Sequence, residues 1–444
     1  MSVFSRSEAD DVARGARAVI ACPDDGRSAR SVEAREEEAR GLALAIHIET
    51  VETRTFRIRQ AKPATLFGSG QMEEIAAIVA AHEAELVIVD GGLTPIQQRN
   101  LEKGTGAKVI DRTGLILEIF GERAATAEGR LQVELAHLDY QAGRLVRSWT
   151  HLERQRGGFG FLGGPGETQI EADRRLIRNR MAKIRRELEE VTRTRGLHRA
   201  RRQRAPWPVV ALVGYTNAGK STLFNRMTGA AVMAKDLLFA TLDPTMRQVS
   251  LPGGGKTILS DTVGFVSDLP TQLVAAFRAT LEEVISADLI VHVRDMAHPD
   301  CEAQADDVMH VLEEIGARGD DGAPMIEIWN KADLLDEEAR ERLAAEALRR
   351  EDVAIISALS GEGLEAAAQL MARHLGRLHR LRDIRVPMAD GASLAWLHSH
   401  GDVEKEVAEE EAMLLSVRLS DADWARFQAR GLDESPLSRR WPES

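Results

Sequence analysis

Residues 214–221 have the types and the spacing of a phosphate-binding loop. They read Gly-Tyr-Thr-Asn-Ala-Gly-Lys-Ser and lie between an apolar run, residues 209–213, and a predicted helix. A glycine, four residues and Gly-Lys-Ser let backbone N–H groups surround an anion at a helix N-terminus. In such a loop the lysine ammonium reaches the β and γ phosphates of a nucleotide, and the serine hydroxyl reaches Mg²⁺. We therefore expect contacts to the phosphates or their metal ion from Gly214, Tyr215, Thr216, Asn217, Ala218, Gly219, Lys220 and Ser221.

A second phosphate motif begins at Asp261, at the end of a predicted strand over residues 256–261. It reads Asp-Thr-Val-Gly. The Asp261 carboxylate can hold Mg²⁺ through water, and the N–H of Gly264 can bind the γ phosphate. Asp-x-x-Gly is common by itself, so the evidence for a phosphate motif is its position after a strand and after the first loop. We expect contacts from Asp261, Thr262, Val263 and Gly264.

Two further segments at predicted strand ends favour guanine as the base. Residues 330–333 read Asn-Lys-Ala-Asp after an apolar strand, residues 325–329. The carboxylate of Asp333 can accept hydrogen bonds from N1–H and the 2-amino group of guanine, whereas adenine offers neither donor. Residues 357–359 follow a predicted strand and place backbone donors where the guanine O6 can accept them. Four motifs in this order predict GTP binding. The expected base contacts are Asn330, Lys331, Ala332, Asp333, Ser357, Ala358 and Leu359.

The charge is distributed unevenly along the 444 residues. Residues 174–204 hold thirteen Arg or Lys and three Glu, a local charge of +10, so the chain total of −12 leaves −22 for the remainder. Three carboxylates cannot pair with thirteen cations, so we expect this segment to contact a polyanion. Arginine suits phosphates, and aromatic residues that could stack on single strands are sparse, so folded RNA is the expected partner. The expected contacts are Arg174, Arg175, Arg178, Arg180, Arg185 and Arg186.

Cysteine content and hydropathy indicate the compartment. Two cysteines, Cys22 and Cys301, cannot build a disulfide framework and fit a reducing cytosol. The first fifteen residues are polar and charged, and no apolar run reaches the length of a membrane span. We expect a soluble, cytoplasmic monomer without a membrane partner.

The pattern of apolar runs predicts an α/β protein of several units. We expect a P-loop GTPase domain with a mainly parallel sheet, preceded by a small α/β domain and a helical hairpin and followed by a small α+β domain. The expected boundaries are 1–16 for a flexible N-terminus, 17–125 for the N-terminal α/β domain, 126–205 for the hairpin with a glycine-rich loop, 206–378 for the GTPase domain, 379–432 for the C-terminal domain and 433–444 for a disordered tail.

Local patterns predict the elements within these units. Short β-branched runs predict strands in the N-terminal domain at 18–21, 45–49, 86–90 and 108–110, with helices between them. The glycine-rich loop is expected at 157–166, and a capping box of Thr168 and Glu171 is expected to begin the second arm of the hairpin. The acidic segment 404–411 in the C-terminal domain is expected to face solvent.

Four stretches resemble those of the HflX family of ribosome-associated GTPases. They are residues 164–169 (Gly-Pro-Gly-Glu-Thr-Gln), 173–177 (Asp-Arg-Arg-Leu-Ile), 239–245 (Phe-Ala-Thr-Leu-Asp-Pro-Thr) and 261–265 (Asp-Thr-Val-Gly-Phe). The resemblance covers most of the chain, and residues 206–378 resemble a translation-factor-class GTPase domain. It implies GTP hydrolysis with Mg²⁺, binding to the large ribosomal subunit and its RNA, and remodelling or splitting of stalled ribosomes.

The resemblance also implies roles for single residues. It makes Thr241 the switch threonine on Mg²⁺ and the γ phosphate, although spacing alone also allows Thr245. The implied catalytic groups are Lys220, Thr241 and Gly264, and the implied metal ligands are Ser221 and Thr241. Further nucleotide contacts are expected from Phe239, Ala240, Thr241, Leu242 and Asp243.

Two positions bear on the rate of hydrolysis. Phe265 stands where many small GTPases place a glutamine that orients the attacking water, which phenylalanine cannot do. We therefore expect slow hydrolysis by the protein alone and acceleration by a partner. Asn217 occupies the loop position that holds a monovalent cation in potassium-activated GTPases, so we expect K⁺ there. Equal hydrolysis rates in potassium and sodium buffers would exclude this cation site.

The sequence is also compatible with two other functions. A signalling switch could use the basic segment to bind an acidic protein instead of RNA. A relaxed hydrolase could also use ATP at residues 90–92, Asp-Gly-Gly, which follow a predicted strand of the N-terminal domain. The plainer interpretation of residues 90–92 is a turn between a strand and a helix, because Asp and Gly are ordinary turn residues.

Overall fold

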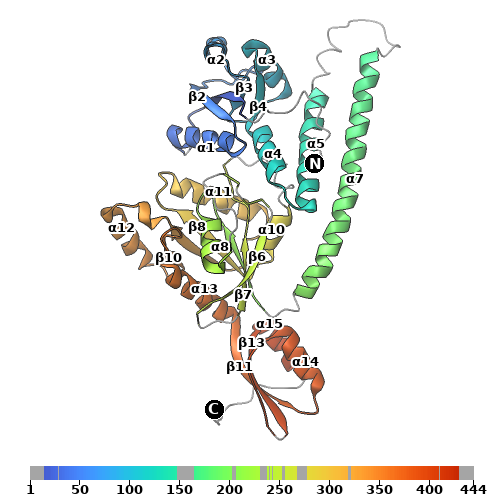
Figure 1. The fold of residues 1–444 in the computed structure, drawn as a ribbon, viewed down its shortest axis with the longest axis vertical. Coiled ribbons are helices and arrows are strands. Elements are labelled where there is room, and N and C mark those ends of the chain that lie inside the picture. The colour runs from blue at the N-terminus through green and yellow to red at the C-terminus, as the bar shows by residue number, and fades with distance from the viewer. Residues whose placement is uncertain are drawn as a thin grey trace.

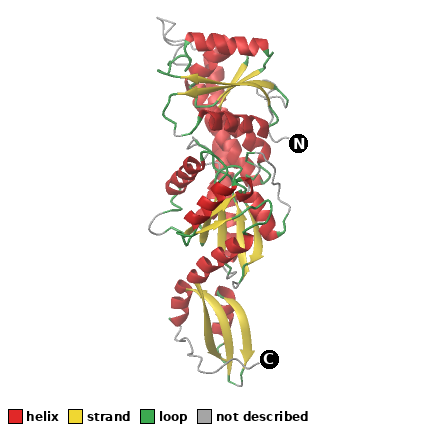
Figure 2. Cartoon of the chain, turned by 90° about the vertical axis from the view of Figure 1, so that its left-hand side faces the viewer, coloured by secondary structure: helices red, strands yellow, loops and turns green. Residues whose placement is uncertain are grey.

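A computed structural model describes residues 15–28, 30–147, 165–202, 207–230, 238–239, 241–242, 244–252, 256–267, 278–318, 322–409 and 411–429. The expected flexible N-terminus up to residue 14, most of the glycine-rich loop and the expected tail lie outside these residues. Figure 1 shows three sheet-containing units stacked along the long axis of the molecule. Figure 2 shows the three sheets one above another from the side. The predicted α/β fold class is confirmed.

The N-terminal unit is a four-stranded parallel sheet with helices on both faces. Its strand order is β2-β1-β3-β4. Alternate residues of β1 enter two separate apolar clusters, Ala18 and Ile20 on one face and Val19 and Ala21 on the other. The strands are β1 (Arg17–Asp24), β2 (Glu49–Arg57), β3 (Leu86–Val89) and β4 (Lys108–Asp111). The helices are α1 (Val32–Ala45), α2 (Ser69–Ala81), α3 (Pro95–Thr105) and α4 (Arg112–Arg123).

The strand predicted at residues 45–49 is wrong. Ala45 ends α1, and β2 starts at Glu49 and continues to Arg57. The strand is rich in Glu, Thr and Arg, because β2 lies at the edge of the sheet and most of its side chains are only partly buried. The apolar residues Ile46 and Ile48 fill the core between the helix and the strand instead.

Two long helices form an antiparallel pair beside the N-terminal unit (Figure 1). They are α5 (Ala127–Arg147) and α7 (Pro165–Arg202), and Met181 and Ile184 of α7 are buried. The predicted start of the second arm at Thr168 is wrong by three residues, because α7 begins at Pro165, a residue suited to a first helical turn. Within the described part of the chain, no helix is long and apolar enough to cross a membrane.

The GTPase unit is a six-stranded sheet in the order β10-β9-β8-β5-β7-β6, parallel except for β6. The strand order reverses at β5, which lies between β8 and β7, and ligands of open α/β sheets bind at such points. The strands are β5 (Val209–Val213), β6 (Thr245–Ser250), β7 (Lys256–Asp261), β8 (Leu289–Asp295), β9 (Met325–Asn330) and β10 (Val353–Ile355). The helices are α8 (Lys220–Thr228), α10 (Arg278–Ile285), α11 (Cys301–Glu314), α12 (Glu337–Ala347) and α13 (Leu364–Leu378), with a short 3-10 turn η1 (Ala332–Leu334).

The C-terminal unit is an antiparallel sheet in the order β11-β13-β12 with two helices. Its elements are β11 (His379–Pro387), α14 (Gly391–His400), β12 (Asp402–Ala408), β13 (Ala412–Ser420) and α15 (Asp421–Gln428). The acidic segment 404–411, expected only to face solvent, contains most of β12. Alternate acidic residues are compatible with an edge strand, because one face of that strand remains in water.

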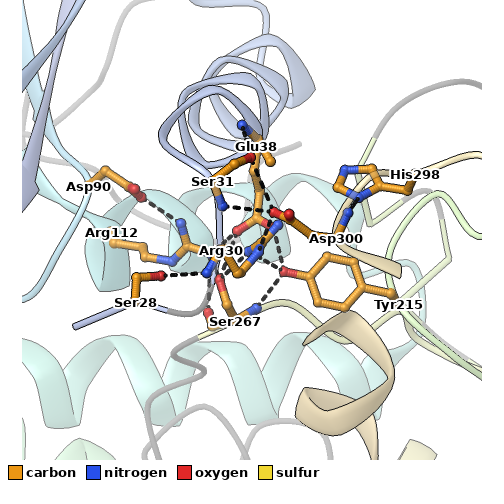
Figure 3. Close-up of polar contacts among 11 residues, drawn as sticks. Ser28, Arg30, Ser31, Glu38, Asp90, Arg112, Tyr215, Ser267, His298 and Asp300 are labelled. Carbon is orange, nitrogen blue, oxygen red and sulfur yellow. Dashed lines mark hydrogen bonds and ion pairs between the residues drawn. The ribbon is translucent and has the colours of Figure 1, made fainter. Parts of the chain in front are cut away.

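A buried polar seam joins the N-terminal unit to the GTPase unit (Figure 3). Arg112, the first residue of α4, donates to Asp90 and to Glu38 of α1. Arg30 donates to the other carboxylate oxygen of Glu38 at 2.8 Å. The Asp90 carboxylate, which the sequence offered as part of a ligand site, therefore forms an ion pair with Arg112 at the boundary between the two units.

The GTPase side of the seam contributes two hydroxyl groups. The Tyr215 hydroxyl, in the phosphate-binding loop, donates to Glu38 and accepts from the backbone N–H of Ser267 at 2.8 Å. Arg30 donates to the Ser267 hydroxyl at 2.8 Å, and Arg112 donates to the same oxygen at 3.1 Å. Figure 3 shows the side chains of both units meeting at this point. The seam therefore binds the loop and the segment after the second phosphate motif together.

Two neighbouring arginines determine the protonation state of Glu38 in the seam. Burial alone would raise the pKa of the Glu38 carboxyl, but Arg112 and Arg30 outweigh burial and hold its pKa at about 2. This pKa lies below the ordinary value of 4.5. The contribution of Glu38 to stability is therefore complete above pH 4.5 and is lost as the pH falls toward 2.

Removing the negative charge of Glu38 should destabilise the folded protein. Glu38→Gln leaves Arg112 and Arg30 buried with a partner that carries no charge. We expect the free energy of unfolding at pH 7, measured by chemical denaturation, to fall by about 3 to 5 kcal/mol. The difference from the unmodified protein should shrink as the pH falls from 4.5 toward 2. The control is Glu37→Gln at the exposed neighbour on α1, for which we expect a change within about 0.5 kcal/mol. Equal stability of the two variants would contradict a role for the seam.

Candidate nucleotide-binding site

The predicted motifs converge at the carboxyl ends of the parallel strands. The loop of residues 214–221 follows β5, Asp261 ends β7, and Asn330 ends β9. Ser357 follows β10 on the same edge of the sheet. Neighbouring parallel strands end at one edge, so four segments that lie far apart in the sequence reach a single crevice.

Close backbone approaches shape the loop. Gly214 has a φ of 151°, and a Cβ there would lie 2.2 Å from the carbonyl oxygen of Val293. Gly219 has a φ of 94°, and its Cβ would lie 2.2 Å from the side-chain nitrogen of Asn330. No residue other than glycine fits either position. The Thr216 N–H donates to the carbonyl of Phe265 at 2.8 Å, so the loop and the second phosphate motif share a backbone hydrogen bond.

Lys220 is buried at the start of α8. Its ammonium donates to the carbonyl oxygens of Gly214 at 3.0 Å and Tyr215 at 2.7 Å, so it curls back over the loop. Burial lowers the pKa of Lys220 to about 8, and Asp261 opposes this shift only in part. A phosphate anion beside Lys220 would raise this pKa again and stabilise the charged form of the lysine.

Three oxygen-bearing side chains meet beside Lys220. The Ser221 hydroxyl lies 2.7 Å from one carboxylate oxygen of Asp261, and the Thr241 hydroxyl lies 3.0 Å from the same oxygen. The two hydroxyl oxygens are 2.9 Å apart. Thr245, the other threonine that spacing allows, begins β6, where it pairs with Asp261 in the antiparallel register.

This set fits a hard divalent cation. The second carboxylate oxygen of Asp261 is buried and has no hydrogen-bond partner, which is costly unless another group compensates it. Burial raises the pKa of Asp261, and its hydrogen bonds from Ser221 and Thr241 oppose that change. Mg²⁺ is usually held by one or two carboxylates and by phosphate oxygens and waters, so one carboxylate with two hydroxyls suits it. In the described residues no group of three or more His, Cys, Asp or Glu could form a metal site made of protein ligands alone.

Asn330 connects the base and phosphate segments. Its amide nitrogen donates to the carbonyl of Ala218 at 2.8 Å, and its amide oxygen accepts from the N–H of Ala358 at 2.9 Å. Lys331 follows with a φ of 64°, and its ammonium lies 2.7 Å from the carboxylate of Asp295. One buried asparagine therefore fixes the distance between the phosphate loop and the turn expected to contact the guanine O6.

Two of the residues expected to contact the base are accessible to solvent. Asp333 lies half-buried in η1, and Leu359 is 69% exposed. Arg340 of α12 donates to the carbonyl of Ala332 at 2.7 Å, and Arg226 of α8 donates to the carbonyl of Leu359. Both arginines stabilise these turns, and nothing in the sequence separates them from the other surface arginines.

Several residues that are expected to contact the nucleotide could do so only through backbone groups, because their side chains are buried or bonded elsewhere. The Thr262 hydroxyl donates to the carbonyl of Leu212 at 2.5 Å, and Val263 is buried in the core. Phe239 and Leu242 are also buried in the apolar cluster that reaches the N-terminal unit. A Cβ at Gly264 would lie 3.0 Å from the Lys220 ammonium, which shows how closely this backbone approaches the loop. Ala240 and Asp243 lie outside the described residues.

Three family models match consecutive parts of the chain. The model "GTP-binding GTPase N-terminal" matches residues 33–121, and "GTP-binding GTPase Middle Region" matches residues 123–202. The model "50S ribosome-binding GTPase" matches residues 209–331. The third match covers the loop, the second phosphate motif and Asn330.

Relatives match most of the chain. GTPase HflX of Magnetococcus marinus is 52% identical over 387 residues, which cover 87% of this chain and 88% of that protein. GTPase HflX of Escherichia coli is 44% identical over 392 residues, covering 88% of this chain and 91% of that protein. A solved structure of a GTP-binding protein from Sulfolobus solfataricus with GDP is 23% identical, covers 82% of this chain and 99% of that chain, and has a TM-score of 0.43. By its sequence relatives and its phosphate and base motifs, the chain belongs to the HflX family of GTPases.

Proposed function

We propose that this GTPase is a GTP-driven switch that binds the large ribosomal subunit in the cytoplasm and remodels or splits stalled ribosomes. The observation that carries the nucleotide part is the meeting of Ser221, Thr241 and Asp261 beside Lys220. The ribosomal part is supported by the family model "50S ribosome-binding GTPase" over residues 209–331.

Each group at the site has a role that follows from its chemistry. Lys220 would neutralise the β and γ phosphates, and the N–H of Gly264 would bind the γ phosphate. Ser221, Thr241 and Asp261, directly or through water, would hold Mg²⁺, which would neutralise charge on the phosphates. Loss of the γ phosphate would remove contacts from the Thr241 and Gly264 segments, and this release is how such switches change shape.

The residue after the second phosphate motif is unsuited to activating water. Phe265 is buried and apolar, and it offers no hydrogen-bonding group to an attacking water. We infer that hydrolysis is slow without a partner, and that a bound ribosome supplies or orders the missing groups. Asn217 is exposed at the tip of the loop with a φ of 59°, and we propose it as the ligand of a potassium ion.

Helix α7 provides the proposed RNA-binding surface. Arg175, Arg178, Arg185 and Arg186 are exposed on it, whereas Arg174 is half-buried. Arg180 differs from these, because its guanidinium donates to Glu134 of α5 at 2.8 Å and connects the two helices. We therefore assign RNA contact to the four exposed arginines and a structural role to Arg180. An acidic protein partner is the alternative that the ribosome-binding experiment below excludes or supports.

Base specificity is tested at Asp333. Asp333→Asn replaces a carboxylate that would accept two hydrogen bonds from guanine with an amide that also donates. We expect the Kd for GTP to rise by about 10²-fold, because a hydrogen bond to a charged group contributes about 1.5 to 3 kcal/mol. Xanthosine triphosphate, which carries an acceptor in place of the 2-amino group, should bind this variant better than GTP does.

The matched control for base specificity is Asp336→Asn. Asp336 is exposed and caps α12 by accepting from the N–H of Ala339 at 2.8 Å, and asparagine caps helices equally well. This variant should bind GTP as the unmodified protein does. Unchanged GTP binding by Asp333→Asn would contradict the assignment of Asp333 to guanine.

Ribosome binding is tested on α7. Replacing Arg175, Arg178, Arg185 and Arg186 by Gln keeps the helix and removes four positive charges. Co-sedimentation with ribosomes over a range of salt concentrations should show weaker binding, and the slope of log K against log salt should become shallower by about 3 to 4. Basal GTP hydrolysis should not change, because these residues lie away from the nucleotide site.

The control for ribosome binding replaces four exposed arginines on other elements, Arg99, Arg342, Arg349 and Arg373, by Gln. The net charge changes equally, so only the position of the charges differs. We expect this control to retain the salt slope of the unmodified protein. Equal loss of binding in both variants, or no loss in the α7 variant, would contradict RNA contact by α7.

A further inference from the structure

The segment just before Thr241 is packed on the N-terminal domain. Phe239 is 2% exposed, and its ring meets the ring of Phe120 of α4 edge to face, with centroids 4.8 Å apart and planes at 89°. Leu238 lies against α1, since a Cβ at Gly41 would be 3.1 Å from its Cδ1. Two helices of the N-terminal domain therefore contact the chain two and three residues before the threonine.

Thr241 is held between two buried neighbours. Phe239 and Leu242 belong to one apolar cluster with Phe120, and the Thr241 hydroxyl between them faces Ser221 and Asp261. Phe239 has a φ of 56°, a conformation that a residue with a side chain adopts only when its surroundings enforce it. Among the described residues, the ring of Phe120 is the aromatic group that packs against Phe239 in this conformation.

We propose that Phe120 is a positioning residue for GTP hydrolysis: it holds Phe239, and thereby places the Thr241 hydroxyl at the Mg²⁺ and γ-phosphate position. The proposal rests on the proposed function of Thr241. It gives the N-terminal domain a part in building the catalytic site, although no residue of that domain needs to touch the nucleotide.

A contact that only stabilises the fold would behave differently. Loss of fold stability lowers the thermal midpoint and leaves the relative affinity for GTP and GDP unchanged. Loss of positioning lowers only the affinity for a nucleotide with a γ phosphate and Mg²⁺, because GDP has no γ phosphate for Thr241 to contact. The ratio of the two affinities therefore separates the two roles.

The test uses Phe120→Leu in the full chain. We expect the Kd for a non-hydrolysable GTP analogue with Mg²⁺ to rise about 3- to 10-fold relative to the Kd for GDP, the range allowed by loss of one edge-to-face pair. The Mg²⁺ concentration for half-maximal GTP hydrolysis should rise as well, and kcat should fall. Phe239→Leu removes the same pair from the GTPase side and should reproduce these changes if Phe120→Leu folds poorly.

The matched control is Phe56→Leu. Phe56 and Phe67 form a second edge-to-face pair in the same domain, with centroids 5.4 Å apart and planes at 71°, in the separate cluster on the other face of the sheet. The control should lower the thermal midpoint without changing the ratio of affinities. The proposal would be overturned if the ratio of the Kd for the GTP analogue to the Kd for GDP were equal in Phe120→Leu, Phe239→Leu and Phe56→Leu.

Thr241→Ala separates failure of this proposal from failure of the proposed function. If Thr241→Ala lowers the relative affinity for the GTP analogue and Phe120→Leu does not, the threonine keeps its role and the positioning proposal fails. If Thr241→Ala changes neither the affinity ratio nor the Mg²⁺ requirement, the proposed role of Thr241 fails and the positioning proposal fails with it. The proposal predicts that adding Phe120→Leu to Thr241→Ala has little further effect on the ratio.

Discussion

The buried charges at the seam between the two domains must be compensated for these domains to pack together. Taking a guanidinium out of water costs several kcal/mol, so Arg112 and Arg30 are stable there only with Glu38 and their other partners in place. Two of those partners, Tyr215 and Ser267, belong to segments that form the phosphate site. The domain seam and the candidate nucleotide site therefore share Tyr215, and we expect a rearrangement of one to affect the other.

An apolar cluster continues across the same boundary. It contains Phe120 of the N-terminal domain together with Phe239 and Phe265 from the two segments expected to respond to the γ phosphate. Packed cores change between discrete arrangements and do not deform smoothly, so movement of the Phe239 segment would require repacking against Phe120 of α4. If the proposed switch function holds, the polar seam and this cluster would couple the N-terminal domain to it, while α7 presents exposed arginines to solvent.

The positions of the phosphate and base motifs at strand ends could be predicted, because their constraints are local. Gly214 and Gly219 sit where no side chain fits, and Asp261 and Asn330 end strands at fixed places in the motif order. Elements whose pattern is polar were harder to predict, as the edge strands β2 and β12 show. The seam was beyond prediction, because a single glutamate on a charged helix resembles a solvent-facing residue. Glu38 meets Arg112 and Tyr215 from 74 and 177 positions away in the sequence, and only the fold brings them together.

We expect the N-terminal domain to respond to the nucleotide through the seam and the cluster. Hydrogen exchange of the full chain, compared between GDP and a non-hydrolysable GTP analogue, each with Mg²⁺, tests it most directly. We expect the amides of α1 and α4 to change their protection together with those of the segments around Thr241 and Gly264. Changes confined to the GTPase sheet and its loops, with α1 and α4 unaffected, would contradict it.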